Sequence, residues 1–401
     1  MDQIAPFIIF LLAAVSKTLA SSILDGARLG MRQVDFGGNF TKDELFARSA
    51  CRSSRLSLDF RSSEYMIDLS IGTPPQLISG LADTGSDLIW AQCKPEQPTG
   101  YDPNKSETVY NLPCNSNECL HAPNRVPDGC CLYDIIYGTG SAQGYIISDT
   151  FRLGDDNPVS IPNMTFGCTF SSSLPNLANF TGIIGLSRSE YSLIRQLGID
   201  KFSYCLDTDV NTVKPMFLGS AAILDGPLVQ STPLLVFPEQ SFFYHVNVTG
   251  ISLGSELLPI PQYLFQFNPS NHSGGVIIDS GTPITRLVPQ AFDIVSQALV
   301  KLVNLPIVDD PSKKLCFSLP SGSKMPSMPD MIFHFDGGDF KWTMDKYMSS
   351  KNGSVFCLLI LKPPGEFTIS VIGTIQMQNI HVLYDLKNNL LSFSPAEFDK
   401  L

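Results

Sequence analysis

The chain has 401 residues, a formal net charge of -11 at pH 7, 43% hydrophobic residues and 16% charged residues. This composition is typical of a globular protein, and the length exceeds the size at which one hydrophobic core stops growing, so we expect two packed lobes. The acidic excess argues against nucleic acid or an anionic membrane as the main partner, because both attract basic surfaces.

The N-terminus has the features of a signal peptide. An apolar run from Ile8 to Val15 precedes small residues at Thr18–Ala20, so we expect residues 1–20 to be removed. Asp2 stands where a basic residue is usual, and a buried helix is the alternative interpretation. Asn-x-Ser/Thr sequences compatible with glycosylation in a secretory route occur at Asn104, Asn163, Asn179, Asn247, Asn271 and Asn352.

Residues 21–60 differ from the rest of the chain in charge. Basic residues outnumber acidic ones there, whereas acidic residues dominate after residue 60. Thr41 followed by Glu44 forms a capping box, which predicts a short helix. A basic helical segment could lie across an acidic cleft, so we interpret residues 21–60 as a propeptide; a loosely ordered N-terminal arm is the alternative.

From Glu64 onward, short apolar runs alternate with turn residues, which predicts a mostly β protein. Two segments, 189–197 and 290–303, are the best candidates for helices. The runs that we interpret as strands are Tyr65–Ile71, Leu77–Ala82, Val246–Ile251, Val276–Ile278 and Val382–Tyr384.

An internal repeat is the most informative feature of the chain. Leu81–Ser86 recurs as Ile277–Thr282, each an apolar strand that ends in Asp and is followed by a hydroxyl residue, Gly and a second hydroxyl residue. Each copy is followed later in the chain by a second short segment, in which two apolar residues stand between a small residue and a glycine. We call these segments the echoes; they are Gly182–Gly185 and Ser370–Gly373. Two similar halves predict two pseudo-symmetric β lobes, over residues 61–228 and 229–401, with a cleft between them where Asp83 and Asp279 meet.

Two carboxyl groups in contact have a defined chemistry. Like charges about 3 Å apart share one proton, so one carboxyl is a base while the other is an acid, for which aspartic proteases are a known example. A water between Asp83 and Asp279 could then be activated for attack on a peptide carbonyl. We expect neither a metal nor another cofactor.

Several motifs resemble those of the pepsin family, and more closely those of its plant nepenthesin-like branch. The resemblance covers about residues 64–395. The motifs are Ser70–Pro74, Asp83–Trp90, Tyr137–Ser141, Phe166–Cys168, Lys201–Cys205 and His334–Asp339.

This resemblance implies roles for residues around the two aspartates. Tyr137, Gly138 and Thr139 match the flap that covers the substrate cleft, and Trp90 matches the tryptophan that bonds the flap tyrosine. The residues that match the support of the dyad are Thr84, Gly85, Ser86, Ser280, Gly281 and Thr282. From the residues alone, Tyr137 is equally a hairpin aromatic, and Trp90 is more often a core residue.

The ten cysteines indicate an oxidising compartment. The resemblance implies the pairs Cys114–Cys131, Cys119–Cys130 and Cys316–Cys357. Some cysteines of the family pattern are missing, so we expect a rewired Cys93–Cys168 bridge that leaves Cys205 as a thiol.

Other functions are less well supported. Gly250–Gly254 matches the nucleophile elbow of serine hydrolases, but Pro259 and Pro261 follow where that elbow needs a helix. The five histidines have no metal-ligand spacing. A binding or inhibitor protein on the same fold, with weak or no activity, is the serious alternative.

We therefore expect an aspartic endopeptidase that hydrolyses proteins or peptides at acidic pH. We expect a monomer without nucleic-acid partners and without stable membrane insertion after signal cleavage. The expected location is extracellular, in the apoplast or cell wall, or else the vacuole.

Overall fold

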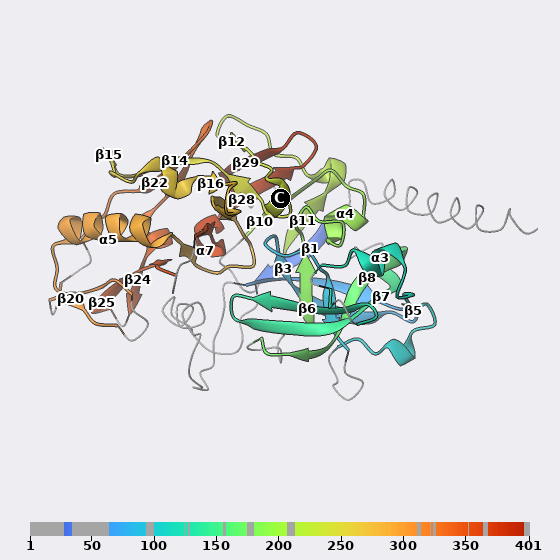
Figure 1. The fold of residues 1–401 in the computed structure, drawn as a ribbon. Helices are drawn as coiled ribbons and strands as arrows, with labels where there is room; N and C mark the ends of the chain where they lie inside the picture. The colour runs from blue at the N-terminus through green and yellow to red at the C-terminus, as the bar shows by residue number, and fades with distance from the viewer. Residues whose placement is uncertain are drawn as a thin grey trace, which may run out of the picture.

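The computed structural model contains two β-rich lobes that share a central sheet (Figure 1). Strands β6, β7 and β8 belong to the lobe at the right of the view, and α5, β20 and β25 belong to the lobe at the left. The structure describes residues 28–33, 64–93, 100–123, 125–126, 129–154, 158–174, 180–206, 213–310, 314–320, 322–323, 326–351, 353–363 and 368–396. The predicted mostly β, bilobal architecture is confirmed.

The largest sheet has 14 strands and runs through both lobes. In sheet order the strands are β12 (Gln230–Pro233), β29 (Leu390–Pro395), β28 (Ile380–Asp385), β10 (Lys201–Cys205), β11 (Val213–Leu218), β1 (Arg28–Gln33), β2 (Tyr65–Ile71), β3 (Gln76–Asp83), β9 (Gly182–Gly185), β4 (Trp90–Gln92), β8 (Val159–Ser172), β7 (Gly140–Leu153) and β5 (Tyr110–Asn111), with β6 (Leu132–Tyr137) paired to β7.

The second half of the chain adds four smaller sheets. The first contains β13 (His245–Val246), β18 (Val276–Ile278), β27 (Ser370–Ile372), β19 (Thr285–Arg286) and β26 (Ile360–Leu361). The second contains β15 (Glu256–Leu257), β14 (Val248–Leu253), β22 (Met331–Phe335) and β23 (Gly338–Trp342). The others are β20 (Ile307–Val308) with β21 (Cys316–Ser318), β25 (Val355–Leu358) and β24 (Met348–Lys351), and the pair β16 (Phe267–Asn268) and β17 (Ser273–Gly274).

The helices are short, apart from α5. Within the described residues, the α-helices are α3 (Asn117–Leu120), α4 (Leu193–Gln196), α5 (Pro289–Val303), α6 (Met344–Tyr347) and α7 (Thr374–Met377). Single 3-10 turns occur at η1 (Pro103–Lys105), η2 (Gly219–Ala221), η3 (Pro238–Gln240) and η4 (Gln262–Phe265).

The internal repeat of the sequence is a repeat of strand pairing. β3 runs parallel to β9, with Asp83 opposite Gly185, and β18 runs parallel to β27, with Ile278 opposite Ile372. Each echo therefore lies beside the strand that leads to an aspartate. Strands buried on both faces are continuous apolar runs, which explains why these segments lack alternation.

Most of the predicted elements are present. β2 and β18 have the predicted bounds, and the helix predicted over 290–303 is α5. The strand predicted over Val246–Ile251 is divided between β13 and β14, and the helix predicted over 189–197 is reduced to α4.

Helix α5 forms where its sequence predicts an amphipathic helix. Phe292, Val295 and Leu299 are buried along one face, Pro289 occupies its first position, and Asn304 ends it in the left-handed conformation, with φ 48°. The buried stripe recurs every three or four residues, as the helical period requires.

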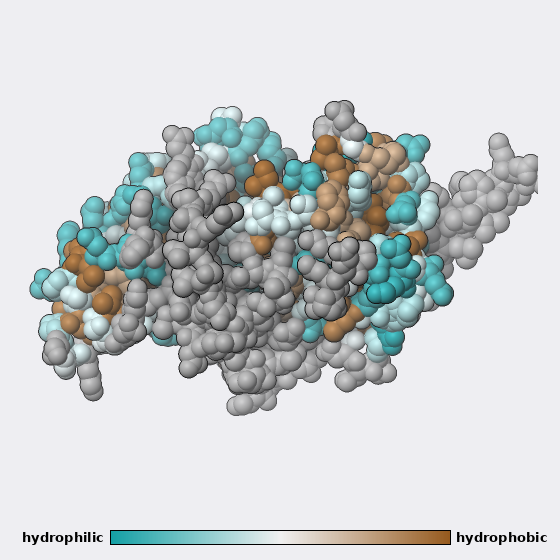
Figure 2. All heavy atoms as spheres, turned by 90° about the horizontal axis from the view of Figure 1, so that it is seen from below, coloured by the Kyte–Doolittle hydropathy of each residue, from teal (hydrophilic) through white to brown (hydrophobic). Residues whose placement is uncertain are grey.

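Apolar packing unites the two lobes. One cluster of buried side chains includes Ile67 and Phe202 from the first half of the chain and Val295 and Phe333 from the second. A separate cluster around Trp90 lies in the first lobe. On the face shown in Figure 2, the described apolar residues form several patches among hydrophilic ones.

Two predicted disulfides are wrong in their partners. Cys114 bonds to Cys130 and Cys119 bonds to Cys131, instead of the reverse. Cys119 and Cys131 are buried, whereas Cys114 and Cys130 are exposed, and Cys131 has φ 53°, so the adjacent cysteines 130 and 131 face different environments.

The other two predicted bridges, Cys93–Cys168 and Cys316–Cys357, are confirmed. Cys205, which lies buried on β10, is not one of the eight cysteines in these four bridges.

The predicted propeptide contributes one described strand. β1 lies between β2 and β11, with Leu29 and Met31 buried in the core. The predicted signal peptide and the capping box at Thr41 and Glu44 lie outside the described residues. Within the described ranges, every helix is too short or too polar to cross a membrane.

Gly182 gives a direct test of the packing beside Asp83. A Cβ at this position would overlap the carbonyl oxygen of Trp90, which belongs to backbone and cannot rotate away. Overpacking usually costs about 1–3 kcal/mol, and a clash with backbone belongs at or above the upper end of this range, so Gly182→Ala should lower the free energy of unfolding by about 3 kcal/mol or more in urea denaturation.

Gly353→Ala is the matched control, since Gly353 has φ 69° and open space around it. It should cost only about 1–2 kcal/mol from the left-handed backbone. Equal losses in the two variants would contradict the close approach of β9 and β4.

Candidate active site

Asp83 is the last residue of β3 and is held by its own turn. The Gly85 N–H donates to Asp83 Oδ1 at 2.9 Å, and the Ser86 hydroxyl donates to Asp83 Oδ2 at 2.5 Å. The parallel pairing with β9 extends through Asp83, whose carbonyl accepts the N–H of Leu186 at 2.8 Å. Both oxygens of the carboxyl group are therefore oriented by donors two and three residues along the chain.

Asp279 repeats this arrangement in the second lobe. It follows β18 directly; the Gly281 N–H donates to its Oδ1 at 2.8 Å, and the Thr282 hydroxyl donates to its Oδ2 at 2.6 Å. The Asp279 N–H donates to the carbonyl of Ile372 on β27 at 3.0 Å. The same local sequence thus produces the same local geometry twice.

The two turns are joined by hydrogen bonds between the lobes. The Thr84 N–H donates to Ser280 Oγ at 3.0 Å, the Ser280 N–H donates to Thr84 Oγ1 at 2.9 Å, and the Ser280 hydroxyl donates to the Ala82 carbonyl at 2.7 Å. Thr84 and Ser280 are almost completely buried. Because an unpaired buried N–H costs about 1–3 kcal/mol, these bonds strongly favour one relative position of the two turns.

The carboxyl groups of Asp83 and Asp279 lie close enough for the charge of Asp279 to act on the pKa of Asp83. Each also lies against the glycine of the opposite turn: a Cβ on Gly85 would be 2.7 Å from Asp279 Cγ, and a Cβ on Gly281 would overlap the Asp83 carboxylate. Glycine at both positions is therefore needed for the carboxyl groups to approach one another.

Burial raises the pKa of Asp83 well above its usual range, and the negative charge of Asp279 raises it further. The hydrogen bonds from Ser86 and Gly85 act in the opposite direction. Asp83 and Asp279 are only 6% and 8% exposed, so little water screens the repulsion between their two carboxyl groups. The geometry favours a pair in which the proton is held by Asp83 more strongly than by an exposed carboxyl group.

A hairpin covers the pair. β6 and β7 are joined at Gly138 and Thr139, with Tyr137 paired to Gly140 across the turn. The Trp90 Nε1–H donates to the hydroxyl of Tyr137 at 2.8 Å. Burial, and next the charge of Asp83, raise the pKa of Tyr137, so its hydroxyl stays protonated above the aspartates.

A cleft cavity of about 470 Å³ lies between the hairpin and the two aspartates. The first lobe supplies an apolar wall that includes Leu81, Phe180 and Ile183, and the second lobe supplies Ile277 and Val371. A cavity of this size and lining accommodates apolar side chains next to a polar reaction centre.

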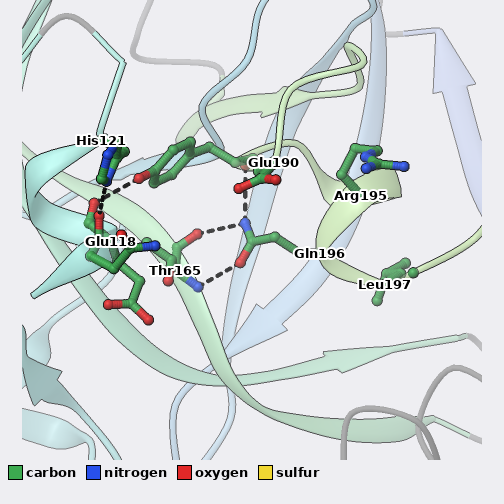
Figure 3. Close-up of a pocket in the computed structure, with 10 residues that line it drawn as sticks. Glu118, His121, Thr165, Glu190, Arg195, Gln196 and Leu197 are labelled. Carbon is green, nitrogen blue, oxygen red and sulfur yellow. Dashed lines mark hydrogen bonds between the residues drawn. The ribbon is translucent and has the colours of Figure 1, made fainter. Parts of the chain in front are cut away.

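A second hollow, of about 510 Å³, lies between α3 and α4 and contains neither aspartate (Figure 3). Its Gln196 amide is already bonded to the backbone of Thr165, donating at 2.8 Å and accepting at 2.7 Å. Glu118 and Glu190 are exposed there. Charges in open solvent are well screened, so these carboxylates are poorly suited to act as catalytic groups.

All of the predicted site residues come together. The cavity is lined by Asp83, Gly85, Tyr137, Gly138, Thr139, Asp279, Gly281 and Thr282, and Thr84, Ser86, Ser280 and Trp90 lie behind them in the hydrogen bonds described above.

Sequence analysis missed Phe180 and Arg286, which also line the cleft cavity. Among the described residues, Asp310, Cys316 and Cys357 form one group with metal-ligand spacing, but the two sulfur atoms are joined in a disulfide.

The chain is similar in sequence and in fold to known proteins. Family models described as xylanase inhibitor N-terminal and xylanase inhibitor C-terminal match residues 65–220 and 243–395. Aspartic proteinases nepenthesin-1 and nepenthesin-2 of Nepenthes gracilis are each 36% identical to the chain, over 93% of it and 90% of their own length. The crystal structure of basic 7S globulin from soybean matches with a TM-score of 0.68 at 20% identity, covering 94% of this chain and 98% of that one.

The raised pKa of Asp83 predicts how stability depends on pH. The folded state holds a proton that the unfolded state releases above the ordinary value of 3.8, so stability contributed by Asp83 is present below that pH and is lost as pH rises towards its folded pKa. The unfolding free energy of the wild type minus that of Asp83→Asn should therefore fall as pH rises above about 4, in urea titrations.

Asp134→Asn, at an exposed position on β6, is the control. The difference between the wild type and this variant should vary less with pH. A difference between the wild type and Asp83→Asn that rises with pH would contradict the burial of the pair.

Proposed function

The chain belongs to the pepsin-like aspartic proteinase family, in its plant nepenthesin-like branch, and from this we propose that it is an endopeptidase that hydrolyses proteins or peptides at acidic pH. The observation that carries the proposal is the close approach of the Asp83 and Asp279 carboxyl groups, each against the glycine of the opposite turn, at the base of a covered cleft.

The reaction needs one proton and one water. The ionised carboxylate of the pair removes a proton from a water as the water oxygen attacks the peptide carbonyl carbon, and the protonated carboxyl gives its proton to the carbonyl oxygen. The tetrahedral intermediate collapses when the carboxyl group that took the water proton gives it to the leaving nitrogen, while the other carboxylate takes back a hydroxyl proton and the C–N bond breaks. One carboxyl group thus acts as base and then as acid, and the other as acid and then as base, which the equivalent turns allow.

The surroundings suit an extended peptide. Tyr137 and the turn of the hairpin lie above the aspartates, and the apolar walls with Phe180 and Ile277 can receive side chains on either side of the scissile bond. Backbone groups of an extended chain can bond the edge of the hairpin. Maturation by removal of residues 1–60, glycosylation and an extracellular or vacuolar location remain part of the same proposal.

A binding or inhibitor function is the second candidate, because the matching family models carry the description of xylanase inhibitors. Such a function does not need a proton shared between two buried carboxyl groups. The intact hydrogen bonds of both turns therefore favour hydrolysis over binding alone.

Replacing either aspartate should abolish turnover. Asp83→Asn or Asp279→Asn removes the shared-proton pair and should lower kcat by about 10³-fold or more, because acid–base catalysis of this kind contributes up to about 10⁴-fold. The measurement is cleavage of a denatured protein at acidic pH by the matured chain.

The exposed variant Asp134→Asn should keep wild-type activity. If the wild-type protein cleaves nothing and does not bind pepstatin, the binding function replaces the enzymatic one. Activity retained in either aspartate variant would contradict the assignment of the pair.

The hydroxyl of Tyr137 should matter for catalysis. Tyr137→Phe removes the acceptor of the Trp90 Nε1–H and loosens the hairpin over the cleft, so kcat/KM for a peptide should fall about tenfold, which corresponds to about 1.4 kcal/mol of transition-state stabilisation.

Tyr145→Phe is the matched control, since Tyr145 lies on the same hairpin but is 50% exposed. Thermal unfolding of both variants checks that the fold is kept. Equal activities of the two variants would show that the bond between Trp90 and Tyr137 has no part in turnover.

A further inference from the structure

Three strands of the second lobe bring together a serine, a histidine and an aspartate. Ser252 lies on β14, His334 on β22 and Asp339 on β23, which are consecutive strands of one sheet; β14 and β22 appear at the upper left of Figure 1. His334 is paired with Asp339 on one side and with Gly250, two residues before the serine, on the other. Because paired residues and residues two apart on a strand share a face of the sheet, the three side chains meet on one face.

The three side chains form a continuous line of hydrogen bonds. Ser252 Oγ lies 2.7 Å from His334 Nε2, and His334 Nδ1 lies 2.7 Å from Asp339 Oδ1. An ionised carboxylate can only accept hydrogen bonds, so in the neutral ring Nδ1 carries the proton and Nε2 is an acceptor. The Ser252 hydroxyl therefore donates to Nε2, which is the arrangement of a nucleophile, a base and a group that orients the base.

The sequence around Ser252 has the spacing of a serine nucleophile without its usual backbone. Gly250–Gly254 reads Gly-x-Ser-x-Gly, but Ser252 lies inside the paired strand β14 and not at a turn between a strand and a helix. Serine triads occur on unrelated folds and are identified by geometry and roles. Here the packing of β22 and β23 against β14 supplies the histidine and the aspartate that the motif alone does not specify.

Neighbouring charged groups have partners of their own. Lys341 Nζ lies 2.7 Å from Asp330 Oδ2, and the Asn247 amide donates to Asp336 Oδ2 at 2.7 Å. The carboxylate that orients the histidine is therefore that of Asp339.

Access to Ser252 depends on one exposed leucine. Ser252 is 6% exposed, whereas Leu257, opposite it on the two-residue edge strand β15, is 63% exposed. A Cβ on Gly250 would be 3.0 Å from Leu257 Cδ1 and 3.9 Å from His334 Cδ2, so the leucine side chain lies over the glycine beside the imidazole. Exposed side chains change rotamer within nanoseconds. Rotation of Leu257 therefore opens space for a small group over Gly250, next to the serine hydroxyl.

We propose that Ser252 is the nucleophile of a second reactive site, which takes an acetyl-sized acyl group from an activated ester. Ser252 Oγ attacks the ester carbonyl carbon while His334 Nε2 takes the hydroxyl proton; the C–O bond to the leaving group then breaks, and the proton passes to the leaving oxygen. Water next attacks the acyl carbon, its proton returns through His334 to Ser252 Oγ, and the acid is released. Asp339 is a positioning residue, which acts through the histidine.

The surroundings of Ser252 limit the kind of ester. Ser252 is paired with Leu257 on one side and with Ile332 on the other, so its main chain belongs to the sheet ladder. Serine hydrolases use free backbone N–H groups to stabilise the oxyanion. An ester with a good leaving group has the least need of that stabilisation, and a small acyl group fits the space beneath Leu257. None of the three proposed residues lines the cleft cavity, so the site is separate from the aspartate pair.

The test is acetylation of the full-length protein by 4-nitrophenyl acetate at pH 8, where imidazole groups are commonly neutral. After an acid quench, which preserves the ester, peptide mass spectrometry measures the acetyl group on each serine. The reference is Ser231, whose hydroxyl lies 2.8 Å from that of Ser392. Ser252 should be acetylated about 100-fold faster than Ser231, because general-base assistance contributes about 10²–10⁴-fold.

Variants assign the reactivity to the triad. His334→Gln removes the base and should slow acetylation of Ser252 by about 100-fold. Asp339→Asn should slow it by about tenfold or more, because the histidine loses the charge that selects its tautomer, and Asp339→Glu should recover part of the rate. Asp339 has a side chain that is 56% exposed, so its variants test the proposal even if His334→Gln folds poorly.

Two further variants complete the set. Asp336→Asn, at a neighbouring exposed carboxylate, is the matched control and should keep the wild-type rate. Leu257→Ala removes the side chain over Gly250 and should raise the rate at Ser252. Thermal unfolding of each variant checks that the fold is kept.

The outcomes separate this inference from the proposed peptidase. Acetylation of Ser252 that is no faster than that of Ser231 overturns the inference, and so does a rate that is unchanged in both His334→Gln and Asp339→Asn. Saturating pepstatin should leave the rate at Ser252 unchanged; loss of the label in its presence would assign the reaction to the cleft and overturn the second site. A protein that cleaves no peptide but acetylates Ser252 as expected supports the second site and contradicts only the peptidase.

Discussion

The constraint on which this structure depends is the contact between two buried carboxyl groups from different halves of the chain. Asp83 and Asp279 cannot both be ionised cheaply when they are this close and this well shielded from water. The repulsion that destabilises the doubly charged pair also keeps one carboxyl group protonated beside the other, which is ionised and can act as a base. The protein therefore needs a scaffold that forces the two groups together and tolerates the resulting loss of stability.

That scaffold consists of hydrogen bonds, strand pairing and apolar packing that act at different distances from the pair. Within each turn, a backbone N–H and a hydroxyl orient the carboxyl oxygens. Between the turns, Thr84 and Ser280 exchange hydrogen bonds. Farther away, β10 and β28 pair in the shared sheet and bring the hydroxyl oxygens of Tyr204 and Tyr384 within 2.8 Å of one another. A common apolar core spans both lobes. Loss of one tie is thus opposed by the others.

The cleft also combines two kinds of electrostatic group with different responses to acid. The aspartate pair gains or loses a proton as the pH changes, and burial and mutual repulsion raise the pKa of Asp83. Arg286 keeps its charge across the same range. The cleft therefore contains one pair of groups that titrates in acid and one cation that does not.

The sequence by itself determined the features that depend on short segments. The repeated Asp-hydroxyl-Gly-hydroxyl motif placed both carboxyl groups, strand and helix periods located β2, β18 and α5, and the two echoes predicted a two-fold arrangement. Only the tertiary structure decided the partners of Cys130 and Cys131, because adjacent cysteines are equivalent in sequence and differ only in burial. It also decided that Arg286 meets the hairpin at Gly138, since that distance is set by the packing of segments remote in the chain.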